Sequence, residues 1–127
     1  MARTQAVKAF KNKDFILDDS CNYVFYEQVK SYDLLNQIPK DNLIYFCNQK
    51  IWEIYEYDKA YKTNYLNTLH IYLQTNRSIK LTSNYLYLHR NTINYRILKI
   101  KELFRINLEN DIMLGQFLLS CQIIQML

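Results

Sequence analysis

Apolar residues recur every three or four positions through most of the chain after residue 40, which is the spacing of one face of an α-helix. Residues that favour helix N-termini stand where several of these patterns begin, notably Asp41, Ser78 and Asn110. Residues 87–89 form a short break between two such patterns. The sequence therefore predicts helices over residues 41–55, from 63 or 64 to about 76, and over 78–86, 90–104 and 110–126.

The first 40 residues carry a weaker pattern. Residues 2–11 predict a short helix and residues 12–19 a polar loop, while residues 22–27 form a β-branched and aromatic run typical of a strand. A lone strand leaves its backbone donors and acceptors unpaired, so it needs a partner. Ser31 is expected to cap a further short helix that ends before Pro39.

Composition narrows the class of protein. The 127 residues include one Gly and one Pro, whereas β-sandwiches and barrels need many turns rich in these residues. Half of the residues are apolar, and a chain of this length can bury a core without disulfide or metal staples. No apolar run approaches the roughly 18 residues that span a bilayer, and the N-terminus lacks a signal-peptide core. We therefore expect one soluble, cytoplasmic, mainly α domain with a short appendage and no membrane partner.

Residues that could bind metals or perform catalysis are sparse and poorly spaced for either task. Cys21, Cys47 and Cys121 lie far apart, so reduced, buried thiols are expected rather than a disulfide framework or a metal site. His70 shares a helix face with leucines and reads as a packed core residue, and the Asp18–Asp19 pair reads as a solvated loop. No arrangement suggests a nucleophile or a phosphate loop. We expect no enzyme activity, no cofactor and no metal.

Charge is distributed unevenly along the chain. Residues 61–105 contain eight Lys or Arg and one acid, Glu102, whereas residues 1–60 contain eight basic and nine acidic side chains. The charged residues after Arg105 are two acids, Glu109 and Asp111. A basic segment of this kind suits a polyanion such as nucleic acid, although a solvated Lys/Arg helix face gives the same count.

The basic segment also has the features of a helix-turn-helix between residues 78 and 104. Thr82 and Ser83 are small, so a second helix can cross the first closely after the three-residue break. At about 100° per residue, one narrow stripe of the second helix is apolar and should face the core: Ile93, Ile97, Ile100 and Phe104. The opposite face holds Asn91, Asn94, Tyr95, Leu98 and Glu102.

Polar side chains gather in the N-terminal half of this second helix, where a recognition helix meets base edges. Asn can pair with adenine and Arg with guanine, while Tyr and Lys commonly contact phosphates. His89 would cap the helix or contact phosphate, and Arg96 would contact phosphate or pair with a buried acid. The candidate DNA-binding residues are His89, Arg90, Asn91, Thr92, Asn94, Tyr95, Arg96, Lys99 and Lys101. An ordinary amphipathic helix with a solvated face is the alternative.

Residues 66–108 resemble the C-terminal DNA-binding domain of the PucR/CdaR family of bacterial transcription regulators. The resemblance rests above all on His89-Arg-Asn-Thr-Ile-Asn-Tyr-Arg96, and Glu56-Tyr57-Asp58 resembles an acidic element just upstream. The chain departs from the family at Thr82 and Ser83, where Ala is usual, and at Leu81 and Phe104-Arg105. These departures leave the fold in place but could alter docking.

The resemblance implies a recognition helix over about residues 90–104 in the major groove of double-stranded DNA, within a domain of residues 41–127. It implies that residues 1–40 are a linker or the remnant of an upstream GGDEF-like α/β domain, to which the single predicted strand would belong. We therefore expect a mainly α helical bundle with a helix-turn-helix and this short remnant. Its expected function is sequence-specific DNA binding in a bacterial transcriptional regulator.

The last predicted helix is apolar on nearly all sides, so it is either central to the core or shared with a partner. A homodimer would form through this helix or through upstream domains, and an effector molecule would bind outside this chain. The competing hypothesis is a protein-interaction or dimerisation module that kept the helix-turn-helix without DNA binding. Such a module would not need the polar set Arg90, Asn91, Tyr95 and Arg96.

Overall fold

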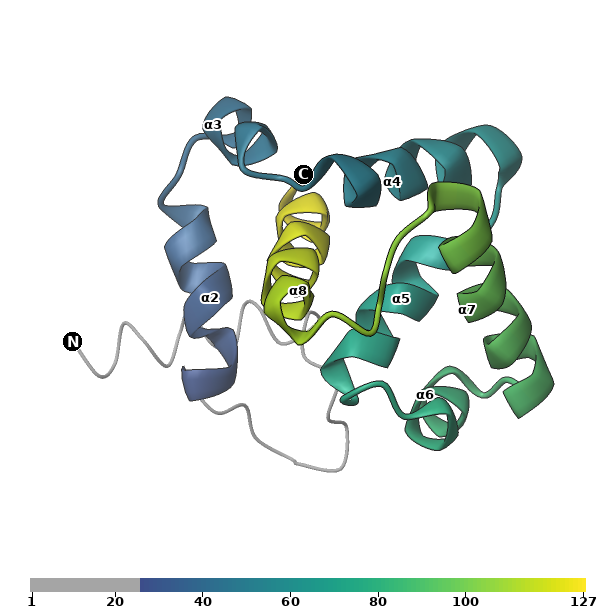
Figure 1. The fold of residues 1–127 in the computed structure, drawn as a ribbon. Coiled ribbons are helices and arrows are strands. Elements are labelled where there is room, and N and C mark those ends of the chain that lie inside the picture. Colours follow the sequence, from purple (N-terminus) through teal and green to yellow (C-terminus); the bar gives the residue numbers. More distant parts are fainter. Residues whose placement is uncertain (1–25) are drawn as a thin grey trace.

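Residues 26–127 are described by a computed structural model and form seven helices, with no strand among them. In chain order these are α2 (Tyr26–Asn36), α3 (Lys40–Tyr45), α4 (Gln49–Tyr61), α5 (Tyr65–Gln74), α6 (Ile79–Leu86), α7 (Arg90–Phe104) and α8 (Asp111–Met126) (Figure 1). The predicted mainly α class is confirmed. The predictions for residues 78–86, 90–104 and 110–126 agree with α6, α7 and α8 to within one residue at each end.

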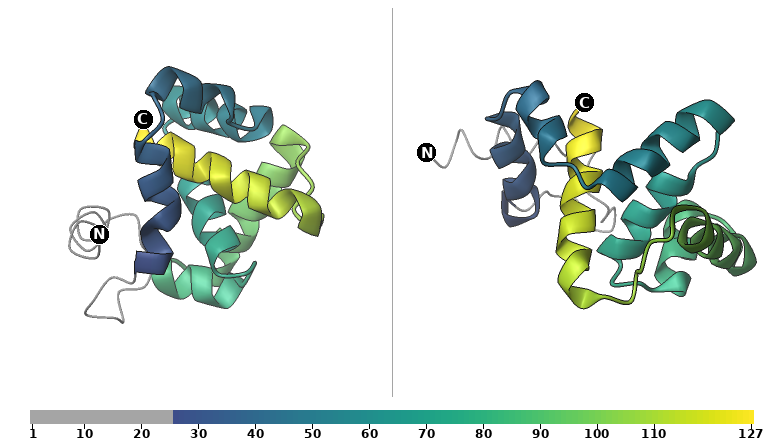
Figure 2. Two further views of the ribbon diagram at one scale, coloured as in Figure 1. Left: turned by 90° about the vertical axis from the view of Figure 1, so that its left-hand side faces the viewer. Right: turned by 45° about the horizontal axis from the view of Figure 1, so that its top comes forward.

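The last helix, α8, lies at the centre of the fold. It packs against α2 and α3 on one side and against α4 and α5 on the other (Figure 1). Helix α5 in turn contacts α4, α6 and α7. Helix α7 lies at the edge of the molecule away from α2, as the right-hand view of Figure 2 also shows. This position leaves the outer face of α7 open to solvent.

The main core lies where α4, α5, α7 and α8 meet. Its fully buried side chains include Ile51, Ile54, Leu69, Ile93 and Ile100, each worth about 1.5–3 kcal/mol relative to an exposed position. The predicted apolar stripe of α7 is confirmed, because all four of its members are buried in this core: Ile93, Ile97, Ile100 and Phe104.

A smaller cluster fastens α2 and α3 to α8. Leu35, Leu43 and Ile123 are its buried members, and the Tyr32 hydroxyl donates to Oε1 of Gln125 at 2.9 Å. The inner face of α8 as a whole contributes Phe117, Ser120, Cys121, Ile123 and Ile124 to the interior. Of the two positions expected for this helix, the structure therefore shows the central one, although Ile112 in its first turn is exposed.

The prediction of a strand at residues 22–27 is wrong where the structure describes that segment, because Tyr26 and Glu27 begin α2. Residues 22–25 lie outside the described residues, as do the predicted helix at 2–11, the loop at 12–19 and the Asp18–Asp19 pair. Ser31 lies inside α2 and so is not an N-cap, and the helix ends at Asn36. Tertiary packing decides this segment, since Tyr32 and Leu35 are one helical turn apart and both dock on α8.

The predicted helix from Asp41 through Tyr55 is divided into α3 and α4. Asp41 lies in the first turn of α3, after Pro39 at the N-cap position. The break falls at residues 46–48, where Asn48 Oδ1 accepts from Lys50 N at 2.9 Å and caps α4. The backbone N–H of Asn48 donates to Ser120 Oγ of α8 at 2.8 Å. A contact with a distant helix therefore fixes this boundary.

Helix α5 starts after Asn64, as predicted, but its cap comes from α4. Asp58 accepts from Tyr65 N at 3.1 Å, from Leu66 N at 2.8 Å and from the Thr63 hydroxyl. Three donors at the start of α5 are thus satisfied by one carboxylate. The helix ends at Gln74, two residues earlier than predicted, and Asn76 and Arg77 follow in the left-handed region.

The cysteines that the structure describes are free thiols. Cys121 is buried in the core and its burial raises the pKa of the thiol, while Cys47 is half-buried beside Ser120. The predicted reduced, buried thiols are confirmed for Cys121 and in part for Cys47, and Cys21 lies outside the described residues. Within residues 26–127, no helix has both the length and the apolar character that crossing a membrane requires.

Candidate nucleic-acid interface

Hydrogen bonds of hydroxyl groups hold α6 against the end of α5. Ser78 Oγ accepts from Leu81 N at 3.1 Å and caps the helix, as predicted. The Thr82 hydroxyl donates to Ser78 O at 2.7 Å and lies 3.0 Å from the Thr75 hydroxyl. Thr82 and Ser83 are both buried, so small side chains line the face where α6 meets its neighbours. This agrees with the close helix crossing that the sequence predicts.

The turn between α6 and α7 is pinned at both of its ends. The Ser83 hydroxyl donates to Leu88 O at 2.6 Å, and Leu88 N donates to Ser83 O at 3.2 Å. Leu88 itself packs against the main core. Between these anchors, Tyr87 adopts the left-handed conformation with φ of 56°. The angle between the two helices is therefore set by side-chain and backbone hydrogen bonds together.

His89 caps the N-terminus of α7. Its Nδ1 accepts from the backbone N–H of Asn91 at 3.0 Å, so the neutral ring carries its proton on Nε2. Of the two roles expected for this residue, the structure shows the cap. The backbone N–H groups of Thr92 and Ile93 donate to His89 O at 3.0 and 3.2 Å, and the positive end of the helix dipole at this terminus would favour an anion.

The outer face of α7 is polar in its N-terminal half and has few internal partners there, whereas Leu98 and Leu103 are exposed further along the helix. Arg90, Asn91 and Asn94 are exposed, and within the described residues their side chains make no hydrogen bond or ion pair. Tyr95 is 56% exposed, and the Lys99 ammonium lies 5.8 Å from the centre of its ring. The open surface that the sequence predicts is thus present, and its groups are free to bind another molecule.

Two of the candidate residues face inward along the flanks of α7. Thr92 is half-buried, and Arg96 donates from Nη1 to the Thr68 hydroxyl of α5 at 3.0 Å. The partner expected for a buried Arg96 was an acid, and the structure shows a hydroxyl. One nitrogen of this guanidinium therefore forms a hydrogen bond that holds α7 on α5.

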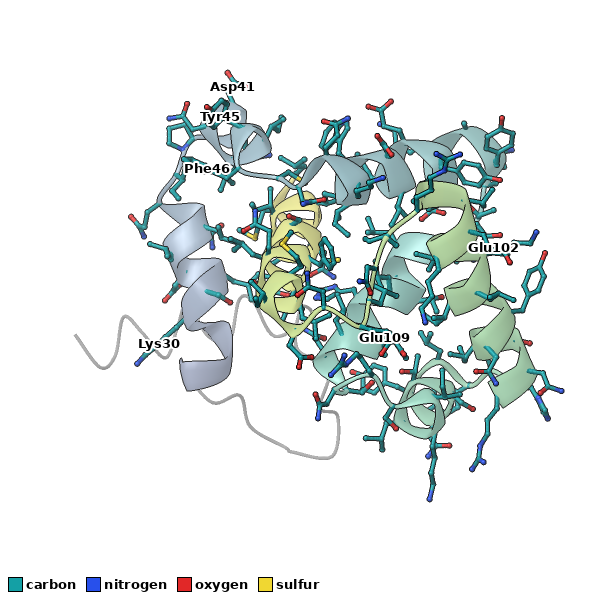
Figure 3. All side chains as sticks on the ribbon, in the orientation of Figure 1. Lys30, Asp41, Tyr45, Phe46, Glu102 and Glu109 are labelled. Carbon is teal, nitrogen blue, oxygen red and sulfur yellow. The ribbon has the colours of Figure 1, made fainter. Side chains whose placement is uncertain are left out.

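Acids that follow α7 in the chain neutralise two cations of the basic segment. Lys101 Nζ lies 3.2 Å from Glu109, a candidate DNA-binding side chain that is therefore paired in this structure. Arg77 lies 2.9 Å from Asp111 and 3.9 Å from Glu109. In Figure 3, Glu109 lies on the connection from α7 to α8, whereas Glu102 points away from the fold. Five cations of the α6–α7 region have no carboxylate partner among the described residues: Lys80, Arg90, Arg96, Lys99 and Arg105.

Two residues near this surface were not among the sequence-based candidates. Asp58 caps α5, which in turn holds α7 through the bond between Thr68 and Arg96. In the sequence, only the place of Asp58 in the acidic element before α5 hinted at a role. Tyr87 lies in the turn, two residues before the cap, and its side chain is 94% exposed. No periodic pattern could have marked Tyr87, because a turn residue belongs to neither helix face.

His70 is a packed core histidine, as expected. It is buried in α5, and desolvation lowers the pKa of its imidazole to about 4. Its Nε2 has no hydrogen-bond partner in the part of the chain that the structure describes. Among those same residues, no three His, Cys, Asp or Glu side chains come together in a group that could hold a metal ion.

Comparison with known proteins is consistent with this geometry. The family model for the PucR C-terminal helix-turn-helix domain matches residues 65–122, from the start of α5 into α8. The DNA-binding transcriptional activator AdeR of Bacillus subtilis (strain 168) is 25% identical over 109 residues, which are 84% of this chain and 25% of AdeR. No solved structure gives a significant match to the chain.

Two further relatives from Bacillus subtilis (strain 168) are more similar over shorter stretches. The purine catabolism regulatory protein is 37% identical over 71 residues, which are 56% of this chain and 13% of that protein. The proline-responsive transcriptional activator PutR is 33% identical over 86 residues, which are 67% of this chain and 21% of PutR. The chain thus spans at most a quarter of the length of these relatives. Residues 65–122 of this chain are a PucR-type C-terminal helix-turn-helix domain.

Proposed function

We propose that the chain binds double-stranded DNA in a sequence-specific manner and is the DNA-binding part of a bacterial transcriptional regulator. In this proposal α7 lies in the major groove, and α6 crosses the sugar-phosphate backbone above it. The observation that carries the proposal is the unpaired polar face at the N-terminal half of α7, formed by Arg90, Asn91 and Asn94. The cap and the turn fix the direction of this helix, so its free polar side chains are presented to a partner in a defined orientation.

The candidate residues divide into three groups by chemistry and position on α7. Asn91 and Asn94 are exposed and carry amides that can both donate to and accept from a base edge, so we assign them to base readout. Arg90, Tyr95 and Lys99 carry cationic or hydroxyl groups at the border of the same face and are assigned to phosphates or, for Arg90, to guanine. Thr92, Arg96 and Lys101 would support these contacts from the flanks, with His89 holding the helix start.

The remaining parts of the regulator are assigned by the same proposal. Residues 41–127 would form the DNA-binding unit and residues 1–40 a linker or the remnant of an upstream domain, with α2 packed on α8. A homodimer would place two copies of α7 in successive major grooves, about one helical turn of DNA apart. The dimer would form through α8 or through upstream domains, and a small-molecule effector would bind outside this chain.

Selection of bound duplexes from a random DNA pool by the whole 127-residue chain tests the proposal. We expect a shared motif among the recovered sequences. Arg90→Ala should weaken binding, and Lys40→Ala on α3, which removes the same charge far from α7, should not. With about four phosphate contacts, affinity should fall about 100-fold between about 50 and 200 mM salt. No enrichment, together with no binding to any duplex at the lower salt concentration, would contradict DNA binding and favour a protein-interaction module.

A further inference from the structure

Tyr87 is unusual in both its conformation and its exposure. It is a bulky residue with φ of 56°, in a region that L-residues with large side chains rarely adopt. Its side chain is 94% exposed, the highest value among the exposed large apolar residues of the described part. Its hydroxyl and ring make no hydrogen bond or ring contact within residues 26–127. Nothing inside the described fold therefore accounts for a tyrosine at this position.

Two other helices end on a non-glycine residue in the same conformation, and they provide a comparison. Lys62 ends α4 with φ of 55° and Arg105 ends α7 with φ of 51°. Both place a cation at a helix C-terminus, where it interacts favourably with the helix dipole. Tyr87 ends α6 in the same way but carries no charge. The electrostatic reason that applies to Lys62 and Arg105 is absent at Tyr87.

The position of Tyr87 relative to the proposed DNA surface is fixed by its neighbours. Ser83 and Leu88 hold the turn through two hydrogen bonds, so the Tyr87 backbone cannot easily move away. The capping His89 and the exposed Arg90 follow within three residues. A tyrosine here presents a long side chain with a terminal hydroxyl beside the N-terminus of α7, and tyrosine hydroxyls commonly donate to DNA phosphates.

We propose that the Tyr87 hydroxyl donates a hydrogen bond to a DNA phosphate at the edge of the major groove that α7 enters. This inference rests on the proposed DNA-binding function and adds a contact from the turn itself. The contact positions the domain on the duplex and reads no base, so it acts on every sequence alike. Because a phenol is neutral, it releases no counterion and leaves the salt dependence of binding unchanged.

Binding of a labelled mixed-sequence duplex, long enough for two half-sites, tests this contact in the whole chain at several salt concentrations. Tyr87→Phe removes only the hydroxyl and should weaken binding about 3- to 10-fold, with the same salt slope and melting temperature. Arg90→Ala should lower the salt slope by about one. Tyr45→Phe is the matched control, because Tyr45 is 84% exposed on α3, at the corner of the molecule away from α7 (Figure 3). It should bind as the unaltered chain does.

Tyr87→Gly separates binding from stability. Glycine adopts the left-handed region readily, so the melting temperature should stay level or rise, as it should for Lys62→Gly, while DNA binding falls at least as far as for Tyr87→Phe. If Tyr87→Phe binds as tightly as the unaltered chain while Arg90→Ala binds more weakly, the hydroxyl contact is wrong and DNA binding by α7 stands. If the unaltered chain binds no duplex even at low salt, both the proposed function and this contact fall.

Discussion

Arg96 on α7 donates from Nη1 to the hydroxyl of Thr68 on α5, at a distance of 3.0 Å. Thr68 is fully buried, and its hydroxyl in turn donates to Asn64 O at 2.8 Å, one turn earlier in the same helix. The guanidinium is therefore linked to the first turn of α5, which Asp58 caps from α4. Through these bonds α4 and α5 together set the orientation of α7.

This link predicts a loss of stability when either partner is removed. Thr68→Val keeps the shape but removes the acceptor, and should lower the free energy of unfolding by about 1–2 kcal/mol. Arg96→Ala should cost a similar amount, and the double variant should cost less than the sum of the two. Urea denaturation measures all three. Lys99→Ala, one turn further along α7, should change stability by less than about 0.5 kcal/mol. Additive losses at Thr68 and Arg96 would show that the two residues act independently.

Asp58 should stabilise the fold as a cap supplied from a neighbouring helix. Asp58→Ala leaves three donors at the start of α5 unpaired, so we expect a loss of about 1–2 kcal/mol in the free energy of unfolding. Asp58→Asn keeps one acceptor oxygen and should lose less. Glu53→Ala removes an acid from an exposed position on the same helix and is the control. Equal stability of Asp58→Ala and Glu53→Ala would rule out the capping role.

His70 should make stability depend on pH in the acidic range. Burial lowers the pKa of its imidazole from 6.5 to about 4, so between these values the unfolded state binds more protons than the folded state. Above about pH 6.5 the protonation of His70 does not lower the free energy of unfolding. The free energy of unfolding falls as the pH decreases through this window and levels off below about pH 4. The total change is on the order of 3 kcal/mol.

Thermal or urea unfolding of the unaltered chain and of His70→Leu at a series of pH values measures this contribution. All other titratable groups are common to the two proteins, so the difference between the two curves isolates His70. The stability of the unaltered chain relative to His70→Leu should fall by this increment as the pH decreases from about 6.5 to about 4, because only the unaltered chain carries the buried imidazole. Parallel curves between pH 4 and 6.5 would mean that His70 is protonated as easily in the folded as in the unfolded state.

Gly115 offers a stabilising substitution. It lies in the interior of α8, its backbone is exposed, and a Cβ added there would meet nothing within 4 Å. Gly115→Ala should therefore raise the free energy of unfolding by about 0.5–1 kcal/mol, because alanine loses less backbone entropy on forming a helix. A lower denaturation midpoint for this variant would show that the outer side of α8 is covered by something that leaves no room for a methyl group.

The elements that the sequence predicted best are those whose ends are decided locally. Ser78 and Asn110 cap α6 and α8 with their own side chains, so the signal and its cause lie within three residues of each other. The break between α3 and α4 could not be predicted in this way. Asn48 caps α4 with its own side chain, but its backbone N–H also donates to Ser120, a residue far along the chain on α8. The prediction for the start of α2 was wrong for a similar reason, because packing of α2 on α8 overrides a local preference for a strand.

The candidate surface shows a similar division. Periodicity alone identified the buried stripe of α7 and the opposite, exposed face. The sequence gives the number of cations in the segment but not which of them form ion pairs. The pairing of Arg77 and Lys101 depends on the path of the chain after α7. Arg96 was correctly placed near the edge of the core stripe, yet the identity of its partner required the position of α5.

Base readout by α7 is tested most directly at Asn91. The chain and Asn91→Ala should be measured against the duplex recovered by selection and a panel of its single-base variants, with Asn42→Ala on α3 as a matched control. We predict that Asn91→Ala loses about 1–3 kcal/mol on the selected duplex and loses discrimination at one base pair, while mixed-sequence binding is unchanged. Equal losses on every duplex, or an unchanged preference at every position, would contradict base readout by this face of α7.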